Sequence, residues 1–290
     1  MGFGNIFARR GHSTEFGPND PRPTVDLPDE YRRSLDWVPQ LGDIFPNFHA
    51  DSTRGHIDFH DWAEGRWVYL FSHPSTRSGI SATEVASIAS AAEFFRERGV
   101  AVMGLCNDPA ASHARWEAEL AALFRLRVDF PVIDDRQAHL SRAFGMIHPK
   151  LRETMAIRKS FILDPSMRVR LMFEYPLDVG RSIDETLRAI DALQAADRTQ
   201  LGVPADWETG DSLLVPPFRS TEDVRNAFGG VEVLAPFLRL VPRCPQARGP
   251  VRTEGLAPNA APAAPDGPAD RPEPRAEAQV QVFPRRADVA

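Results

Sequence analysis

The chain has 290 residues and a formal net charge of -6, with 42% hydrophobic and 26% charged residues. These fractions are typical of a globular protein. The acidic balance argues against a nucleic-acid partner and against an anionic membrane surface, because both require a basic face. No apolar run is long enough for a membrane helix. The N-terminus is too polar for a secretory signal, so we expect a cytoplasmic protein.

The chain contains two cysteines, Cys106 and Cys244. They are too few for a disulfide framework, and neither belongs to a CxxC pair. No cluster of histidines and cysteines has zinc spacing. We therefore expect no metal and no other cofactor.

Both ends of the chain differ in composition from its middle. Residues 1–40 are polar and rich in proline and glycine, which predicts an extended N-terminal arm. Residues 245–290 are rich in proline and alanine and hold few large apolar side chains, so burial cannot offset the entropy of ordering them. We expect this tail to be disordered.

The middle of the chain alternates between strand and helix patterns. A buried strand is predicted over 67–71, a helix with one apolar face over 83–98, a strand over 100–105 and a helix over 110–124. Strands over 161–163 and 169–173 flank a turn at Asp164-Pro165-Ser166, and an amphipathic helix follows over 182–194. This order predicts an α/β sandwich of the thioredoxin type.

Motifs shared with a known family run from Gly42 to about Pro245. They are Gly42-Asp-Ile-Phe-Pro-Asn-Phe48, Leu70-Phe71-Ser72-His73-Pro74, Phe130-Pro-Val-Ile-Asp-Asp135-Arg136, Arg158-Lys-Ser-Phe161-Ile-Leu-Asp164-Pro165, Tyr175-Pro-Leu-Asp-Val-Gly180-Arg181, Pro204-Ala-Asp-Trp207 and Gly210-Asp-Ser-Leu-Leu-Val-Pro216-Pro217. In these motifs the sequence resembles the peroxiredoxin (AhpC/TSA) family, and the last two resemble the C-terminal domain of its one-cysteine branch. The resemblance implies a thioredoxin-like peroxiredoxin domain over 41–200, a C-terminal dimerisation domain over 201–244 and a homodimer.

The active-site motif of the family, Pro-x-x-x-Thr-x-x-Cys, is altered here. The corresponding window runs from Pro74 through Ser78 to Ser81. The proline is kept, Ser78 preserves the hydroxyl of the threonine, and Ser81 stands where the resemblance places the peroxide-reacting cysteine. The resemblance therefore implies that the family's thiol is missing.

Loss of the thiol changes the chemistry available at position 81. Peroxide reduction needs a nucleophile that ionises near neutral pH and accepts an oxygen atom as a sulfenic acid. A serine hydroxyl does neither, and as a nucleophile it would need a nearby base, for which His73 is the only candidate close in sequence. We therefore predict a pseudo-enzyme that acts by binding. Ser81-Ala-Thr-Glu84 is also a capping-box pattern, so we expect Ser81 to be a structural N-cap.

Arg136 and Arg158 match the two family positions that hold the thiolate and the peroxide, and Glu84 matches the glutamate that orients them. Together with a helix N-terminus they could form a pocket for a small anion. The alternative is that Glu84 neutralises both arginines in a buried ion-pair network.

Other interpretations remain open. Cys106 ends a strand that should run parallel to the strand over 67–71, which could bring its thiol to the active-site edge and support a thiol-dependent peroxidase. The alternative is that Cys106 is a small buried hydrophobic residue.

His73 matches a family position beside Pro74, and we expect it to be a hydrogen-bonded packing residue rather than a base. The chain could also be a dimeric scaffold that displays its tails to an unknown protein partner.

Overall fold

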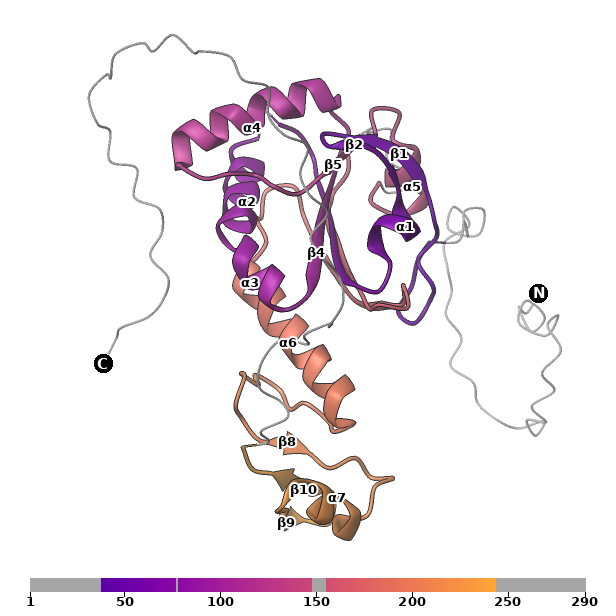
Figure 1. Cartoon of the computed structure of the whole chain (residues 1–290), viewed down its shortest axis with the longest axis vertical. Helices are drawn as coiled ribbons and strands as arrows, with labels where there is room; N and C mark the ends of the chain where they lie inside the picture. Colours follow the sequence, from indigo (N-terminus) through magenta and orange to yellow (C-terminus); the bar gives the residue numbers. More distant parts are fainter. Residues whose placement is uncertain (1–37, 77, 148–154, 244–290) are drawn as a thin grey trace, which may run out of the picture. The chain divides into compact units, whose positions relative to one another are not determined.

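The computed structural model of the chain describes residues 38–76, 78–147 and 155–243. The predicted arm before residue 38, the predicted tail after residue 243 and Cys244 lie outside the described residues. The main sheet has seven strands in the order β2-β1-β5-β4-β3-β6-β7. Figure 1 labels β1, β2, β4 and β5 of this sheet. The strands are β1 (His49–Ser52), β2 (Gly55–Asp58), β3 (Trp67–His73), β4 (Val100–Cys106), β5 (Val132–Asp134), β6 (Arg158–Leu163) and β7 (Val169–Tyr175).

The centre of the sheet is parallel and its flanks are antiparallel. β3 pairs with β4 from Trp67↔Val100 to His73↔Cys106, and β4 continues onto β5 in the same direction. β6 pairs with β3 in the opposite direction, and β7 pairs with β6. The carboxyl ends of the three parallel strands therefore meet at one edge of the sheet.

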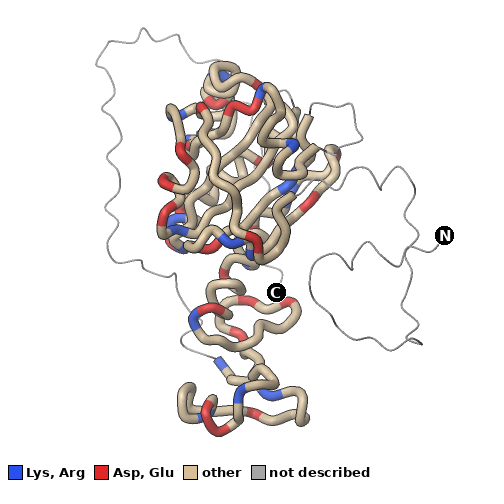
Figure 2. The backbone as a smooth tube through the Cα atoms, turned by 90° about the vertical axis from the view of Figure 1, so that its right-hand side faces the viewer, with Lys and Arg blue, Asp and Glu red and all other residues tan. Residues whose placement is uncertain are grey.

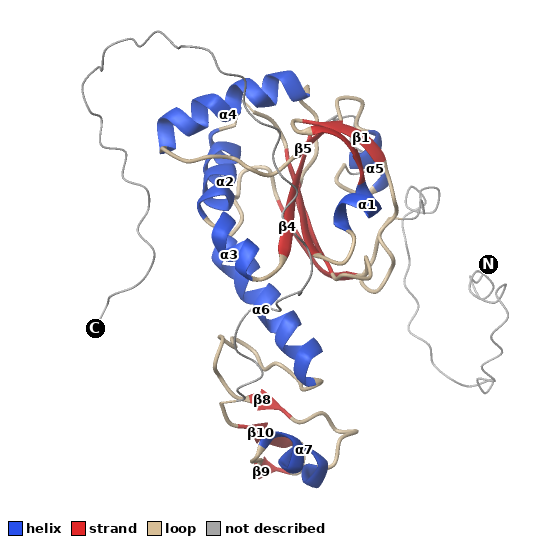
Figure 3. Ribbon diagram, viewed as in Figure 1, coloured by secondary structure: helices blue, strands red, loops and turns tan. Residues whose placement is uncertain are grey.

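Helices cover both faces of the sheet (Figure 3). On one face lie α2 (Gly79–Ser90), α3 (Ala92–Glu97), α4 (Ala110–Phe124) and α6 (Ile183–Thr199), and on the other α1 (Phe59–Ala63) and α5 (His139–Ala143). Successive strand residues point to opposite faces. Accordingly Tyr69 and Phe71 pack with residues of α2, α3, α4 and α6, whereas Val68 and Leu70 pack in a second cluster with Phe59 of α1.

The observed elements follow the predicted order, with one difference in the first long helix. The segment predicted as one helix over 83–98 begins earlier, at Gly79, and is interrupted at Ala91, where φ is -90° and ψ is 4°. The helix over 110–124 has the predicted bounds, and α6 extends beyond its predicted end. The hairpin of β6 and β7 surrounds the predicted turn. The predicted thioredoxin-type α/β arrangement is confirmed.

A second, small sheet follows α6. Its strand order is β8-β10-β9, formed by β8 (Leu213–Leu214), β9 (Glu232–Ala235) and β10 (Leu238–Val241), with α7 (Thr221–Phe228) before β9. Its core contains the fully buried Trp207, together with Leu213, Val224 and Val241, and Ala195 of α6 joins the same cluster. This segment therefore has its own hydrophobic cluster, to which the end of α6 contributes.

Charged residues of both signs are interspersed along the described part of the chain (Figure 2). None of the helices in this part is long and apolar enough to span a membrane.

Candidate functional site at Ser81

The loop between β3 and α2 carries the predicted motif and is held by one carboxylate. Asp108, just after β4, accepts hydrogen bonds from the Thr76 backbone N–H at 2.7 Å, the Thr76 hydroxyl at 2.7 Å and the Ser75 hydroxyl at 3.2 Å. Pro74 is buried at the start of the loop. These contacts attach the loop to the carboxyl edge of the sheet, directly before α2 begins.

The N-cap of α2 is Ser78. Its backbone is extended, and its hydroxyl accepts the Ser81 N–H at 3.4 Å. The prediction that Ser81 is the N-cap is therefore wrong: Ser81 lies in the first turn, with its side chain fully buried. The predicted capping box does not form, because the helix begins three residues earlier and Glu84 is engaged elsewhere. Both serines have suitable N-cap chemistry, and the extended backbone at Ser78 determines which one caps the helix.

The carboxylate of Glu84 binds two buried arginines. Arg158, at the start of β6, donates from Nη1 to Glu84 Oε2 at 2.5 Å. Arg181, between β7 and α6, donates from its backbone N–H and from Nε to Glu84 Oε1, each at 2.9 Å, and from Nη2 to Oε2 at 3.0 Å. Each carboxylate oxygen of Glu84 therefore accepts two hydrogen bonds, all of them from the two arginines.

Arg158 connects this ion-pair network to both serines. Its Nη1 lies 3.3 Å from Ser81 Oγ, its Nη2 lies 3.4 Å from Ser78 Oγ, and Nε and Nη2 donate to the Leu177 carbonyl at 3.0 Å. We call Ser78, Ser81, Glu84, Arg158 and Arg181 the Ser81 cluster.

The Ser81 cluster has an excess positive charge. The side chains of Glu84, Arg158 and Arg181 are only 1–2% exposed. Two guanidinium groups, which stay protonated, and one carboxylate leave a single positive charge. The N-terminus of α2 adds a positive partial charge at the same place. The cluster is therefore a buried, electropositive site.

Gly180 allows the loop that carries Arg181 to approach α2 closely. A Cβ at this position would lie 3.3 Å from Ile80 Cγ2, which is tighter than most side-chain contacts. The close approach brings the Arg181 backbone N–H within hydrogen-bond distance of Glu84.

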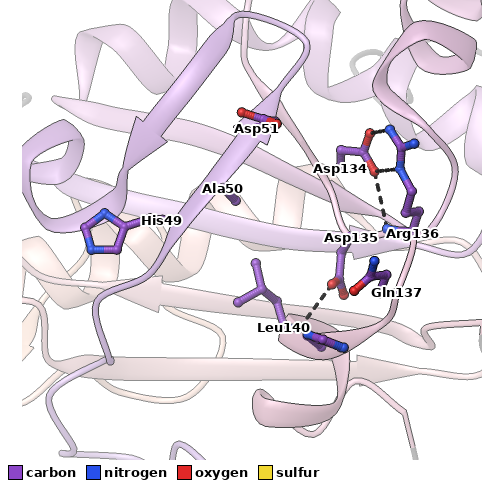
Figure 4. A pocket seen from close by; sticks show the side chains of 9 residues that line it. His49, Ala50, Asp51, Asp134, Asp135, Arg136, Gln137 and Leu140 are labelled. Atoms are coloured by element: carbon purple, nitrogen blue, oxygen red, sulfur yellow. Dashed lines mark hydrogen bonds and ion pairs between the residues drawn. The ribbon is translucent and has the colours of Figure 1, made fainter.

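Arg136 lies outside the Ser81 cluster. It follows β5, its side chain is 59% exposed, and it forms an ion pair with Asp134 through Nη2 and through Nε at 3.0 Å. This hydrogen-bonded partner holds the pKa of Asp134 below its ordinary value. Both residues border an open cavity of about 560 Å³, together with His49, Asp51 and others (Figure 4). The predicted pocket of Arg136 and Arg158 is thus wrong, because Arg136 has a local acidic partner two residues away.

Arg181 is the second arginine of the site, and it is not among the site residues that the sequence motifs predict. It ends the motif that starts at Tyr175 and directly precedes the N-cap of α6, Ser182. The sequence signal for Arg181 is its place in a shared motif with no acidic residue within two positions, whereas Arg136 follows Asp134 and Asp135 directly.

His73 ends β3 and is hydrogen bonded to a second histidine. His73 Nε2 lies 2.9 Å from Nε2 of His113 on α4, and His113 Nδ1 lies 3.1 Å from Glu117 Oε1. Burial, followed by the charges of His113, Arg181 and Arg158, lowers the pKa of His73 well below its ordinary value. His73 is therefore neutral near neutral pH. His113 is not among the predicted site residues. The sequence feature that indicates its contact with Glu117 is the i, i+4 spacing of the two residues on one helix.

Cys106 lies beside His73 in the strand register and is completely buried. Burial, with the nearby carboxylate of Asp108, raises the pKa of the Cys106 thiol to about 12. At neutral pH the thiolate, which is the nucleophilic form, is therefore almost absent. Among residues 38–76, 78–147 and 155–243, no group of three or more His, Cys, Asp or Glu side chains is placed to hold a metal ion.

Comparisons with known proteins agree with this arrangement. The AhpC/TSA family model matches residues 41–172, and the model for the C-terminal domain of 1-Cys peroxiredoxin matches residues 192–230. A peroxiredoxin of Aquifex aeolicus is 37% identical over 196 residues, which cover 64% of this chain and 88% of the relative. The 1-Cys peroxiredoxin A of Oryza sativa subsp. japonica is 34% identical over 193 residues, which cover 65% of this chain and 88% of the relative.

A solved structure shows the same similarity. A cysteine-to-serine mutant of peroxiredoxin 6 of Arenicola marina aligns with a TM-score of 0.67 and 35% identity, covering 70% of this chain and 98% of that chain. The fold is thus a thioredoxin-like α/β domain with a C-terminal domain of the one-cysteine type. The chain belongs to the peroxiredoxin family.

Proposed function

We propose that this protein binds a small monovalent anion at the Ser81 cluster and does not reduce peroxide. The observation that supports this is the charge left over there: two buried arginines share one carboxylate beside the Ser81 hydroxyl and the N-terminus of α2. A buried charge without a partner is unfavourable, and helix N-termini attract anions. One negative charge would neutralise the cluster.

In this proposal Ser81 stands where relatives carry the reacting thiol, and its hydroxyl serves as a neutral polar contact for the anion. Serine ionises too weakly to replace a thiolate, and His73 is hydrogen bonded to His113 rather than to Ser81. Serine-based nucleophilic catalysis therefore lacks its base in this arrangement.

Nitrate is a suitable probe, because it is monovalent and keeps its charge across the near-neutral pH range. We expect titration calorimetry to detect nitrate binding to the wild-type protein. Ser81→Asp should abolish it, because the new carboxylate would occupy the anion position next to Arg158. Ser81→Asn, a neutral side chain of the same shape, should retain weakened binding.

The stability of these two variants is the second part of the test. A carboxylate in the first turn suits the helix dipole and the excess charge, so Ser81→Asp should be at least as stable to urea as Ser81→Asn. Two results would contradict the anion site. One is a Ser81→Asp protein that is much less stable than Ser81→Asn. The other is a wild-type protein that shows no heat of nitrate binding in calorimetry.

A thiol-dependent peroxidase is the second candidate, and the comparisons favour it, because the relatives at 37% and 34% identity are named peroxiredoxins. The only described thiol is that of Cys106, whose burial and raised pKa count against it. Peroxide consumption with dithiothreitol separates the two candidates. Activity that Cys106→Ala removes and Cys244→Ala leaves intact would support the peroxidase. Activity no higher than that of the double variant would support binding.

The homodimer and the display of tails to a protein partner also remain proposals. Deleting the residues after Pro245 tests the scaffold: capture of a partner by the full chain and not by the shortened chain would support it.

A further inference from the structure

Four hydrogen-bonded side chains lead from the protein surface toward the Ser81 cluster. Arg54 Nη2 donates to Glu117 Oε2 at 2.8 Å, Glu117 Oε1 contacts His113 Nδ1 at 3.1 Å, and His113 Nε2 lies 2.9 Å from His73 Nε2. The exposed fraction of the side chains falls from 39% at Arg54 through 11% at Glu117 to 1% at His113. His73 is fully buried. We call these four residues the histidine chain.

The sheet register places the inner end of the histidine chain beside the Ser81 cluster. β3 and β6 are antiparallel, with Phe71 opposite Ser160. His73 and Arg158 each lie two residues beyond this pair, and successive strand residues alternate between the two faces, so they project to the same face as Phe71 and Ser160. Directly opposed residues of antiparallel strands project to the same face of the sheet. His73 and Arg158 therefore share the face that α2 and α4 cover.

The histidine pair can gain one proton without losing a contact. Two imidazole nitrogens at 2.9 Å hold one hydrogen between them. With Nδ1 of His113 donating to Glu117, the neutral pair has His73 Nε2 donating to His113. An added proton makes His113 an imidazolium that donates to both Glu117 and His73, while the hydrogen of His73 moves to its Nδ1.

We propose that the site takes up its anion together with a proton, which is held on the His73–His113 pair; this inference rests on the proposed anion site. Before an anion binds, the excess positive charge of Arg158 and Arg181 opposes a second positive charge nearby. A bound anion cancels the excess and removes this opposition. Because binding linkage is reciprocal, a lower pH then strengthens anion binding. The ligand class is a small monovalent anion that is taken up together with a proton from solution.

The charged and titratable groups around His73 come from several elements. They are His113 and Glu117 of α4, Cys106 at the end of β4, Asp108 after β4, Glu84 of α2, Arg158 of β6 and Arg181 of the loop before α6. Among these groups, the histidine pair has the carboxylate of Glu117 as a hydrogen-bond acceptor for an imidazolium, and His73 Nδ1 is a buried nitrogen without a hydrogen-bond partner among the described residues that can take the displaced hydrogen.

Titration calorimetry with sodium nitrate in two buffers of different ionisation enthalpy tests this directly, since the difference in heat counts protons taken up per anion. The wild-type protein should take up as much as one proton, and nitrate affinity should rise by up to about tenfold for each unit of falling pH. Glu117→Gln keeps the size of the side chain and removes the carboxylate, so proton uptake should decrease. His113→Gln should abolish it. His56→Gln, at an exposed histidine, should behave like the wild type.

The outcomes separate this inference from the proposed function. Nitrate heats that are the same in both buffers would overturn the proton coupling and leave the anion site intact. Proton uptake that persists in His113→Gln would place the proton elsewhere and also overturn it. If His113→Gln does not fold, Glu117→Gln decides, and unchanged uptake in that variant contradicts the proposal. No nitrate binding by the wild type would contradict the proposed function, and with it this inference.

Discussion

The Ser81 cluster and the Asp134–Arg136 pair use the same kinds of side chain in different surroundings. In the cluster, Glu84 and two arginines are almost completely removed from water and carry one excess positive charge. Asp134 and Arg136 are balanced in charge, and Arg136 is largely exposed beside an open cavity. Water can solvate the exposed guanidinium, whereas the buried charges depend on one another. Charge balance and the burial of every partner, rather than residue type, distinguish the candidate site from an ion pair whose arginine reaches solvent.

The largest expected effect is that of Glu84→Gln. This change removes the only carboxylate shared by Arg158 and Arg181. Breaking a buried ion pair by removing one partner typically costs about 3–5 kcal/mol. Urea unfolding followed by circular dichroism should therefore show a large loss of free energy of unfolding.

Glu185→Gln is the matched control for this change, because Glu185 pairs with Arg188 at a part-exposed position on α6. Its loss should be about 1 kcal/mol or less. Equal losses for the two variants would mean that burial does not distinguish the Ser81 cluster from other ion pairs.

Local patterns predicted the elements of this fold but not the partners of the site. The alternating buried strands and amphipathic helices can be recognised from neighbouring residues, and the strand over 67–71 and the helix over 110–124 were found in this way. The pair of Glu84 and Arg181 spans 97 positions. No local pattern reveals such a contact, so the sequence motifs predict Arg136, and not Arg181, as the partner of Arg158 and Glu84.

The N-cap error has a different origin. Ser78 and Ser81 are both followed by residues that can enter a helix, and each satisfies the local N-cap preference. What selects Ser78 is its extended backbone, in a loop whose preceding residues are held by Asp108. Asp108 lies 32 positions from Thr76, and its contact with the loop was also not visible in the local sequence.

The second expected effect is a dependence of stability on pH through His73. Its pKa lies well below 6.5 in the folded chain, because of burial and the charges of His113, Arg181 and Arg158. Below about pH 6.5 the unfolded chain binds a proton that the folded chain does not. The free energy of unfolding should therefore fall as the pH falls, by up to about 1.4 kcal/mol per pH unit from this residue.

The measurement compares urea unfolding of the wild type and of His73→Gln from neutral to mildly acidic pH. Carboxylates contribute to both proteins, so the difference between the two slopes reports His73. Identical slopes would show that His73 is protonated equally in the folded and unfolded chains, and the excess positive charge of the nearby Ser81 cluster would then not reach it.

The third effect separates the two serines of the cluster. Ser78→Ala should cost about 0.5–2 kcal/mol of unfolding free energy, the usual loss for an N-cap. Ser81→Ala should cost less, because Ser81 loses only the contact with Arg158 at 3.3 Å and makes no cap. Thermal unfolding of both variants tests this order. A larger loss for Ser81→Ala would restore Ser81 as the residue that holds the helix end.

The smallest expected effect is that of Arg136→Gln, and it tests whether the Asp134–Arg136 pair takes part in the site. Arg136 itself is well solvated, and the buried Asp134 carboxylate keeps the Ala110 backbone N–H at 2.9 Å as a partner, so the loss of stability should be about 1 kcal/mol or less. Its guanidinium contacts Asp134 and not the Ser81 cluster, so nitrate affinity should also stay at the wild-type value. Arg181→Lys is the informative counterpart, because lysine keeps the charge and loses the hydrogen bonds that guanidinium makes to both Glu84 oxygens. It should weaken nitrate binding through a displaced Glu84. Should Arg136→Gln weaken nitrate binding as much as Arg181→Lys does, the anion would have to bind next to β5, and the Ser81 cluster would be a structural ion-pair network only.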